Sequence, residues 1–463
     1  MATATITRPV TSDLPVTAEL TRCLATTNYD ALPEDVRTLA CQCLLDFVAV
    51  TLAGASETLT GLLRDEALEE GATPIASLIG HPARVSPPQA ALINGAASHA
   101  LDYDDVNLAM NGHPTVTILP ALVALAEARG ASGRELLTAF VAGYEAACRI
   151  GALVLPGHYA QGFHATATLG SFAAAAACAH LIGLNAETTA MALGIAGTQA
   201  AGLKSMFGTM CKPLHAGLAA RNGLMAAKLA ARGFSSRPDV LECAQGFAAT
   251  HGPDFHPQAA LSDAAVGFHL RNNLFKYHAA CYLTHAPIEC ARALRDEHAF
   301  TPDAVRTAEL RVESGASAVC HILAPKTGLE AKFSLRQNTA FALAGIDTAR
   351  LDTYSERLTH DPAVARLRDK VVVDFVPGWP STLAELRVTL IDGHTLTTRF
   401  DSGVPSRDLA AQGRRLAAKF FSLVEPVLGR ARAEQIAEAV SAFDRLERVS
   451  ELTRLCVPEA AMS

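Results

Sequence analysis

The spacing of apolar residues changes twice along this chain, and that double change constrains the fold more than any other feature. Up to about residue 270, apolar positions recur every three or four residues, as in the stretch 36–47, which is typical of packed helices. Residues 308–313 (AELRVE) instead alternate between apolar and charged, which is the period of a half-buried strand. After Ser406 the helical spacing returns. This order predicts helices, then mixed structure, then helices again.

We therefore expect a mainly α protein with three consecutive parts. Residues 1–270 should form a large all-α helical domain, residues 271–404 a small inserted α+β domain, and residues 405–463 helices that return to the first domain. With 463 residues, the chain exceeds the length at which a single hydrophobic core normally stops growing, which also favours two domains. A cleft between two domains is a common place for a small ligand.

Local signals indicate where individual elements begin or turn. Ser132 followed by Glu135 is a capping box for a helix, and Asn185 is a favourable N-cap for the next one. In the segment ELRVTLIDGHTLTTRF, the pair Asp392-Gly393 predicts a hairpin with a type I′ turn, in which both residues have positive φ.

Composition limits the classes of function. Only 18% of the residues are charged and the net charge is −7 without a basic cluster, which argues against nucleic acid as a partner. The longest apolar stretch, residues 169–184, is alanine-rich and contains His180, so we expect a packed core helix and no membrane span. The N-terminal sequence MATATITRPVTSDLP lacks the apolar core of a signal peptide. The eleven cysteines form no CxxC pair, which favours a reducing, cytoplasmic location.

One segment, residues 207–223 (FGTMCKPLHAGLAARNG), places Lys212 and His215 at the start of an apolar helix. Burying a lysine without a partner is costly. Because the neighbouring Met210 and Leu214 are apolar, Lys212 is expected to lie against a core or cleft wall and to hold an anion. The alternative is a lysine whose stem packs against the protein while its ammonium group reaches solvent.

A second segment, residues 98–115 (SHALDYDDVNLAMNGHPT), combines three acids with a histidine. Asp102, Asp104 and Asp105 resemble a calcium loop, but the EF-hand pattern fails because its sixth position is not glycine. A solvated acidic loop is the alternative for Asp104 and Asp105. His113 lies between glycine and proline, which fix the backbone and suit a side chain whose direction matters. Alternatively, His113 only hydrogen-bonds the loop that follows Asp105.

The remaining histidines and cysteines do not form a convincing metal site. His158 and His164 are six residues apart, without the helical spacing or the nearby carboxylate that zinc ligands usually show. In residues 275–285 (FKYHAACYLTH), two histidines and Cys281 lack a second ligand group at matching spacing. We therefore expect no bound metal.

Motifs for nucleotide binding and for activated nucleophiles are also missing. The sequence contains no GxGxxG, no P-loop and no GxSxG elbow. Histidines and lysines are instead concentrated in glycine-punctuated apolar segments of an acidic chain. Such a set can neutralise a polycarboxylate and leave a histidine for proton transfer near neutral pH.

Five segments together resemble the MmgE/PrpD family, which includes 2-methylcitrate dehydratase, cis-aconitate decarboxylase and iminodisuccinate epimerase. The segments are LDYDD…GHPT, GFHATATLG, FGTMCKPLHAGLAARNG, FKYHAACYLTH and LEAKFS, and they occur in the family's order over nearly the whole chain. The resemblance implies a cofactor-free homodimer, in which a helical domain built from both ends of the chain carries an inserted α+β lid.

The resemblance also implies roles for individual residues. Family active-site positions fall on Asp102, His113, Lys212 and Lys276, and His164 matches the histidine of a GxHxT segment. The shared chemistry is proton transfer at a carbon next to a carboxylate. Lys212 and Lys276 would hold substrate carboxylates. His113 would transfer the proton and Asp102 would orient it.

Further candidate substrate contacts are His158, His215, Cys281 and His321. By the resemblance, animal decarboxylases carry a histidine at the position of Cys281 and a tyrosine near that of His321. Val106 stands where the family often has threonine. These differences argue against an itaconate-forming decarboxylase of the animal type and leave the other branches of the family open.

Three functions remain open on the sequence. The first is a lyase that dehydrates or decarboxylates a citrate-like polycarboxylate. The second is an epimerase of a dicarboxylate such as iminodisuccinate, which needs acid/base groups on both faces, for example His113 with His164 or His321. The third is a non-catalytic helical scaffold, in which His113, Lys212 and Lys276 would lie far apart or face solvent.

Overall fold

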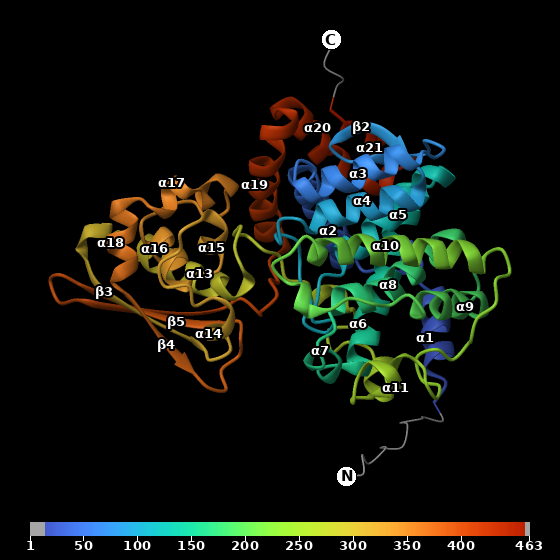
Figure 1. Cartoon of the computed structure of the whole chain (residues 1–463), viewed down its shortest axis with the longest axis horizontal. Helices are drawn as coiled ribbons and strands as arrows, with labels where there is room; N and C mark the ends of the chain where they lie inside the picture. The colour runs from blue at the N-terminus through green and yellow to red at the C-terminus, as the bar shows by residue number, and fades with distance from the viewer. Residues whose placement is uncertain (1–13, 459–463) are drawn as a thin grey trace. The chain divides into compact units, whose positions relative to one another are not determined.

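The computed structural model describes residues 14–458, which fold into two compact units. Unit 1 combines the chain up to Asn273 with the C-terminal part from Leu409 onward, and unit 2 comprises Leu274–Asp408. Figure 1 draws unit 2 in yellow and orange. Residues 1–13, on which the expectation of no signal peptide mainly rests, lie outside the described residues.

Unit 1 is mainly helical. Its longer helices are α1 (Val16–Ala25), α2 (Glu34–Gly54), α3 (Thr58–Glu70), α4 (Pro87–His99), α5 (Thr115–Arg129), α6 (Gly133–Val154), α8 (Ala165–Ile182), α9 (Ala186–Gly197), α10 (Cys211–Ala230), α19 (Leu409–Leu428) and α20 (Arg430–Ser441). Its short helices are α7 (Gly157–Ala160), α11 (Phe247–His251), α12 (Pro257–Leu261) and α21 (Ser450–Leu455). Two predicted caps are confirmed, because Ser132 and Glu135 form a capping box before α6 and Asn185 caps α9.

Helix α8 is a core helix, as its alanine-rich sequence predicts. It packs against α5, α6, α9 and α10, and almost all of its residues are buried (Figure 1). Helices α2, α6 and α8 are long and apolar enough to cross a membrane, but between 78% and 94% of each apolar window is buried inside the protein. Their apolar surface therefore packs against the protein's own helices.

Helices α4 and α10 cross at two glycines. A Cβ added to Gly95 would lie 2.8 Å from the Cα of Gly217, and a Cβ added to Gly217 would lie 2.1 Å from the carbonyl oxygen of Leu92. The two backbones therefore touch directly, which only glycine permits. This contact fixes the separation between the end of α4, at His99, and the first turn of α10, where Lys212 lies.

We expect the substitution Gly217→Ala to destabilise the protein. The added methyl group fits beside the Leu92 carbonyl only if α4 and α10 move apart, and overpacking of this kind costs about 1–3 kcal/mol. Gly61 in α3 offers a matched control, since a Cβ there would meet only an Arg64 nitrogen at 3.8 Å. Gly61→Ala should be neutral or stabilising. Thermal unfolding checks this expectation, and equal melting temperatures for the two variants would contradict it.

Unit 1 also contains two strands, which corrects the expectation of an all-α domain over residues 1–270. Strands β1 (Ala76–Leu78) and β2 (His81–Val85) pair antiparallel, with Leu78 opposite His81. Gly80 in the turn has a φ of 81°, a conformation that favours glycine. Strands of three and five residues are too short to show a clear period of two in the sequence.

Unit 2 has an α+β fold. Its four-stranded sheet has the order β4 (Val371–Val376), β3 (Val305–Glu313), β5 (Leu383–Leu390) and β6 (Thr395–Asp401), in which only the β3–β4 pair is parallel. Helices α13 (His285–His298), α16 (Leu335–Leu343) and α18 (Pro362–Asp369) pack on the sheet (Figure 1). The shorter helices are α14 (Ala316–Val319), α15 (Gly328–Lys332) and α17 (Glu356–Thr359). The alternating pattern of β3 is confirmed, because Ala308, Leu310 and Val312 are all buried.

The predicted hairpin forms between β5 and β6, but its turn differs from the predicted type I′. Gly393 has a φ of 94°, whereas Asp392 is not among the non-glycine residues with positive φ. The backbone nitrogen of Leu390 donates to the carbonyl of His394, which leaves a three-residue loop ending in a left-handed glycine. Asp392 instead uses its carboxylate to accept from the backbone nitrogen of His394.

Candidate active site

The loop between α4 and α5, residues 100–114, folds back on itself. Asn107 and Gly112 form an isolated antiparallel bridge within it. Asp102 and Asn111 have φ values of 51° and 49°. Such left-handed conformations cost energy for residues other than glycine and are concentrated at functional sites. The fold of this loop gathers its acids and His113 into a small volume.

His113 is fixed against the start of α8. A Cβ added to Gly112 would lie 3.0 Å from the backbone nitrogen of Thr166, so glycine allows the loop to come this close. The backbone nitrogen of His113 donates to the Thr166 hydroxyl at 3.2 Å, and Pro114 then leads directly into α5. The Gly-His-Pro sequence thus sets the direction of the imidazole, as predicted from its restricted backbone.

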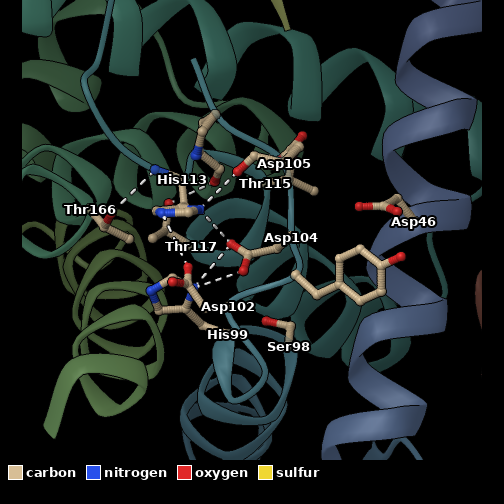
Figure 2. A network of polar contacts seen from close by, with 12 residues as sticks. Asp46, Ser98, His99, Asp102, Asp104, Asp105, His113, Thr115, Thr117 and Thr166 are labelled. Atoms are coloured by element: carbon tan, nitrogen blue, oxygen red, sulfur yellow. Dashed lines mark hydrogen bonds and ion pairs between the residues drawn. The ribbon is translucent and has the colours of Figure 1, made fainter. Parts of the chain in front are cut away.

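Asp104 contacts two imidazole rings at once (Figure 2). Its Oδ2 lies 2.9 Å from Nδ1 of His113, and its Oδ1 lies 2.9 Å from Nδ1 of His99. The backbone carbonyl of Asp105 also lies 2.9 Å from Nδ1 of His113. The contact between His113 and the loop after Asp105, stated above as an alternative, therefore exists alongside the carboxylate contact.

Burial and hydrogen bonding set the charges of this group. Burial alone would raise the pKa of Asp104, but the neighbouring His99 and His113 lower that pKa well below its usual value through charge and hydrogen bonds. Burial lowers the pKa of His99 to about 4, against the opposing effect of the Asp104 carboxylate. At neutral pH, Asp104 is therefore ionised and His99 is neutral.

Asp102 pairs with Lys212. The ammonium nitrogen of Lys212 lies 2.8 Å from Oδ2 of Asp102, and the Lys212 side chain is only 17% exposed. The prediction that Lys212 lies against the protein and holds an anion is thus confirmed, with Asp102 as the anion. Asp102 approaches Nε2 of His113 only to 3.8 Å, which is beyond hydrogen-bonding distance. In the structure Asp104, and not Asp102, holds the His113 ring.

His164 and His215 form a histidine pair next to this group. Their Nδ1 atoms lie 3.0 Å apart, so one ring donates to the other. Burial, followed by the charges of nearby groups that include His99 and Lys212, strongly lowers the pKa of His164, and burial also lowers that of His215. His164 immediately precedes α8, and its ring meets Phe207 edge-on at 4.9 Å.

His99 links the two parts of the cluster. The centroid of its ring lies 4.5 Å from that of His113 and 6.1 Å from that of His164. Lys212 contributes electrostatically to both His99 and His164. The structure therefore brings together five residues predicted from sequence (Asp102, His113, His164, Lys212 and His215) and adds His99 and Asp104 to them.

His158 lies in a different polar environment. Its Nε2 lies 2.7 Å from the Thr168 hydroxyl, and its Nδ1 lies 2.8 Å from the carbonyl oxygen of His251. Its ring stacks on Phe163. With both nitrogens engaged and the side chain buried, His158 supports the local fold, and its role as a substrate contact stays a prediction.

The other predicted substrate contacts belong to unit 2. The Lys276 side chain is almost completely buried there, and its charge acts on His285. Cys281 is half-buried, and its backbone nitrogen donates to the carbonyl of Lys332. His321 is exposed, with its ring edge-on to Phe375. Their role in substrate binding stays a prediction.

Sequence analysis did not assign Asp104 and His99, which lie next to His113, to the site. Asp104 and Asp105 are each only 1% exposed, so the alternative of a solvated acidic loop is wrong. Burial raises the pKa of Asp105 to about 7, and its side chain accepts from the Thr115 hydroxyl. His99 ends an apolar helix, where a histidine normally completes a core. Its closeness to three acids in the sequence was the only signal that could have indicated its role.

The structure also groups potential metal ligands, which their sequence spacing did not reveal. Ligand atoms of His99, Asp102, Asp104 and His113 all lie within 4.8 Å of one another. However, Asp102 already contacts the Lys212 ammonium, and Asp104 already faces two ring nitrogens. A divalent ion would have to displace these partners, so the geometry fits a hydrogen-bonded network better than a metal centre.

We accordingly expect catalytic activity to survive exhaustive chelation. Asp102 is paired with the Lys212 ammonium and Asp104 accepts hydrogen bonds from two imidazole rings, so their arrangement should not depend on an ion. The measurement is kcat/KM before and after dialysis against a strong chelator, together with elemental analysis of the purified protein. Stoichiometric zinc or iron that is lost together with activity would show that the cluster is a metal site.

Comparison with known proteins gives a consistent result. Residues 18–260 match the MmgE/PrpD N-terminal domain, and residues 278–445 match the MmgE/PrpD C-terminal domain. The cis-aconitate decarboxylase of Homo sapiens is 30% identical over 394 residues, which cover 80% of each chain. The cis-aconitate decarboxylase of Aspergillus terreus (strain NIH 2624 / FGSC A1156) is 25% identical over 472 aligned residues, or 95% of each chain.

Proposed function

Because this chain belongs to the MmgE/PrpD family, we propose that it is a cofactor-independent lyase that acts on a small, citrate-like polycarboxylate. The names of its relatives support decarboxylation of cis-aconitate as the first reaction to test. Dehydration of 2-methylcitrate, which the sequence segments also suggest, is the second.

The observation that carries this proposal is a fixed cation beside an oriented imidazole. Lys212 is held at 2.8 Å by Asp102, and the same Asp102 lies 3.8 Å from Nε2 of His113. Loss of CO₂, or of a proton next to a carboxylate, leaves negative charge on carbon that spreads onto the carboxylate. A fixed ammonium group stabilises that charge as it develops, while the imidazole takes or returns the proton.

Burial strengthens this arrangement. The side chains of Asp104 and His99 are at most 2% exposed, that of His113 is 12% exposed and that of Lys212 is 17% exposed. Charges act over a given distance more strongly where water is largely excluded. The Lys212 ammonium is therefore positioned to act on a substrate carboxylate without first shedding a full hydration shell.

Three further parts of the proposal rest on the family resemblance. Lys276 binds a second substrate carboxylate, unit 2 acts as a lid, and the chain works as a cytoplasmic homodimer. Lys276→Met should then raise KM more than it lowers kcat, because it removes a binding charge.

Size-exclusion chromatography with light scattering measures the mass in solution, and a monomer at working concentration would contradict the dimer.

An epimerase is the second candidate. It requires acid/base groups on both faces of the substrate carbon, and the cluster contains two candidates for this pair, His113 from the α4–α5 loop and His164 at the start of α8. An epimerase would return the proton to the opposite face of the same carbon without releasing CO₂ or water.

One experiment separates these functions. The purified protein is incubated in D₂O with cis-aconitate, 2-methylcitrate and iminodisuccinate in parallel, and the products are followed by ¹H NMR. A lyase is expected to release CO₂ or water, and the decarboxylation product should carry one deuterium at the carbon that is protonated. Deuterium uptake with inversion alone identifies an epimerase. No turnover and no exchange with any of the three would contradict the proposed function.

A further inference from the structure

Asp104 is a buried carboxylate that lies between two imidazole rings (Figure 2). We propose that Asp104 is the positioning residue of this site: it accepts a hydrogen bond from Nδ1 of both His99 and His113, and so leaves Nε2 of His113 as the nitrogen that exchanges a proton with the substrate. This inference rests on the lyase function proposed above and extends it to a residue that the sequence motifs did not assign.

The tautomer of His113 follows from the atoms around its Nδ1. Oδ2 of Asp104 and the backbone carbonyl oxygen of Asp105 both lie 2.9 Å away. Neither an ionised carboxylate nor a carbonyl can donate a hydrogen bond. Nδ1 must therefore carry the proton, and in the neutral ring Nε2 then has a free lone pair.

His99 holds Asp104 in place from the opposite side. Its Nδ1 lies 2.9 Å and 3.0 Å from the two oxygens of Asp104, so this ring also donates through Nδ1. Its Nε2 is buried and has no hydrogen-bond partner within residues 14–458. In the other tautomer, the hydrogen on Nε2 would be a buried donor without an acceptor, and the Asp104 carboxylate would lose the donor at Nδ1. Both effects make that tautomer costly.

The same contact stabilises the state formed during turnover. When the lone pair on Nε2 of His113 takes the substrate proton, the C–H electron pair stays on the substrate and the ring becomes positively charged. Nδ1–H still faces the Asp104 carboxylate, which offsets the new charge. No oxidant, reductant or second substrate is needed, and return of the proton restores the neutral ring.

A carboxylate is required for this double role because both of its oxygens accept. An asparagine at this position has one accepting oxygen and two donating hydrogens. In Asp104→Asn, one of the two rings must lose its acceptor or move its proton to Nε2. The variant keeps the shape of the residue and changes only hydrogen bonding and charge.

The first test needs no substrate. The protein is labelled with ¹⁵N-histidine, and the ring nitrogens are assigned by the signals that disappear in His99→Gln and His113→Gln. In the unmodified protein at neutral pH, we expect both rings as the Nδ1–H tautomer, and in Asp104→Asn we expect at least one to change. An Nε2–H tautomer for His113 in the unmodified protein would overturn the proposal, whether or not the enzyme acts on the substrates tested.

The second test separates positioning from general stability. Asp104→Asn should lower kcat about 10- to 100-fold with KM nearly unchanged, since the Asp105 carbonyl still holds the ring and Lys212 still binds substrate. Glu145→Gln is the matched control, because Glu145 is another buried acid of unit 1 and lies against Arg149. It should leave kcat unchanged. If Asp104→Asn changed kcat no more than Glu145→Gln, or changed KM alone, the positioning role would be excluded.

Discussion

Lys212→Met is expected to lower kcat/KM by about 100- to 1,000-fold, the effect of removing one fixed group that stabilises developing charge. Methionine keeps most of the apolar stem, so packing in the first turn of α10 should survive. What disappears is the ammonium group 2.8 Å from Asp102. Asp102 is then left without its cation and repels a substrate carboxylate, which adds to the loss.

A matched control for this variant lies in the same helix. Lys228 is in the last turn of α10, far along the helix from Lys212, so Lys228→Met should leave kcat/KM unchanged. Steady-state kinetics on both variants, with thermal unfolding to confirm folding, make the comparison. A folded Lys212→Met protein with the kcat/KM of the parent would mean that Lys212 only neutralises Asp102 and takes no part in turnover.

His113→Gln is expected to lower turnover by about 100- to 10,000-fold, the range typical of a positioned acid/base group. Glutamine can hydrogen-bond the loop and so preserve its fold, but it cannot shuttle a proton near neutral pH. The rate of exchange between substrate hydrogen and solvent deuterium, measured by NMR, reports the proton transfer directly.

His180 provides the control for His113. It lies at the end of α8, where Nε2 contacts the carbonyl oxygen of Thr27 at 2.9 Å. Glutamine can replace that hydrogen bond, so His180→Gln should exchange at the rate of the parent. If His113→Gln also exchanged at that rate, the base would lie elsewhere, and His164 would become the first candidate.

The elements that sequence analysis predicted well are those governed by neighbours along the chain. The capping box at Ser132 and Glu135, the N-cap at Asn185 and the alternating strand β3 each depend on residues a few positions apart. The predicted type of the hairpin turn was wrong, because the turn type depends on how the paired strands twist and end. A dipeptide such as Asp392-Gly393 does not determine that geometry by itself.

The sequence predicted that Lys212 would be a cation of the site, but it did not predict which residue pairs with it. Apolar neighbours indicated that Lys212 would need an anion, yet that anion, Asp102, belongs to a different segment of the chain. The Gly-His-Pro sequence singled out His113, and the resemblance to a family gave His113 and His164 their proposed roles. The shared contact of Asp104 with His99 and His113 depends on the left-handed turn at Asp102, which no local pattern of residues specifies.

The backbone contact between α4 and α10 matters for anyone who wishes to engineer the substrate range. At Gly95 and Gly217 there is no side chain to trim or enlarge, so libraries randomised at these positions should yield mostly unfolded clones. Phe207 and Met210, by contrast, are 39% and 50% exposed and lie just before Lys212. Variation at these two positions can change the surroundings of the ammonium group and of the His164 ring while the spacing of the two helices stays constant.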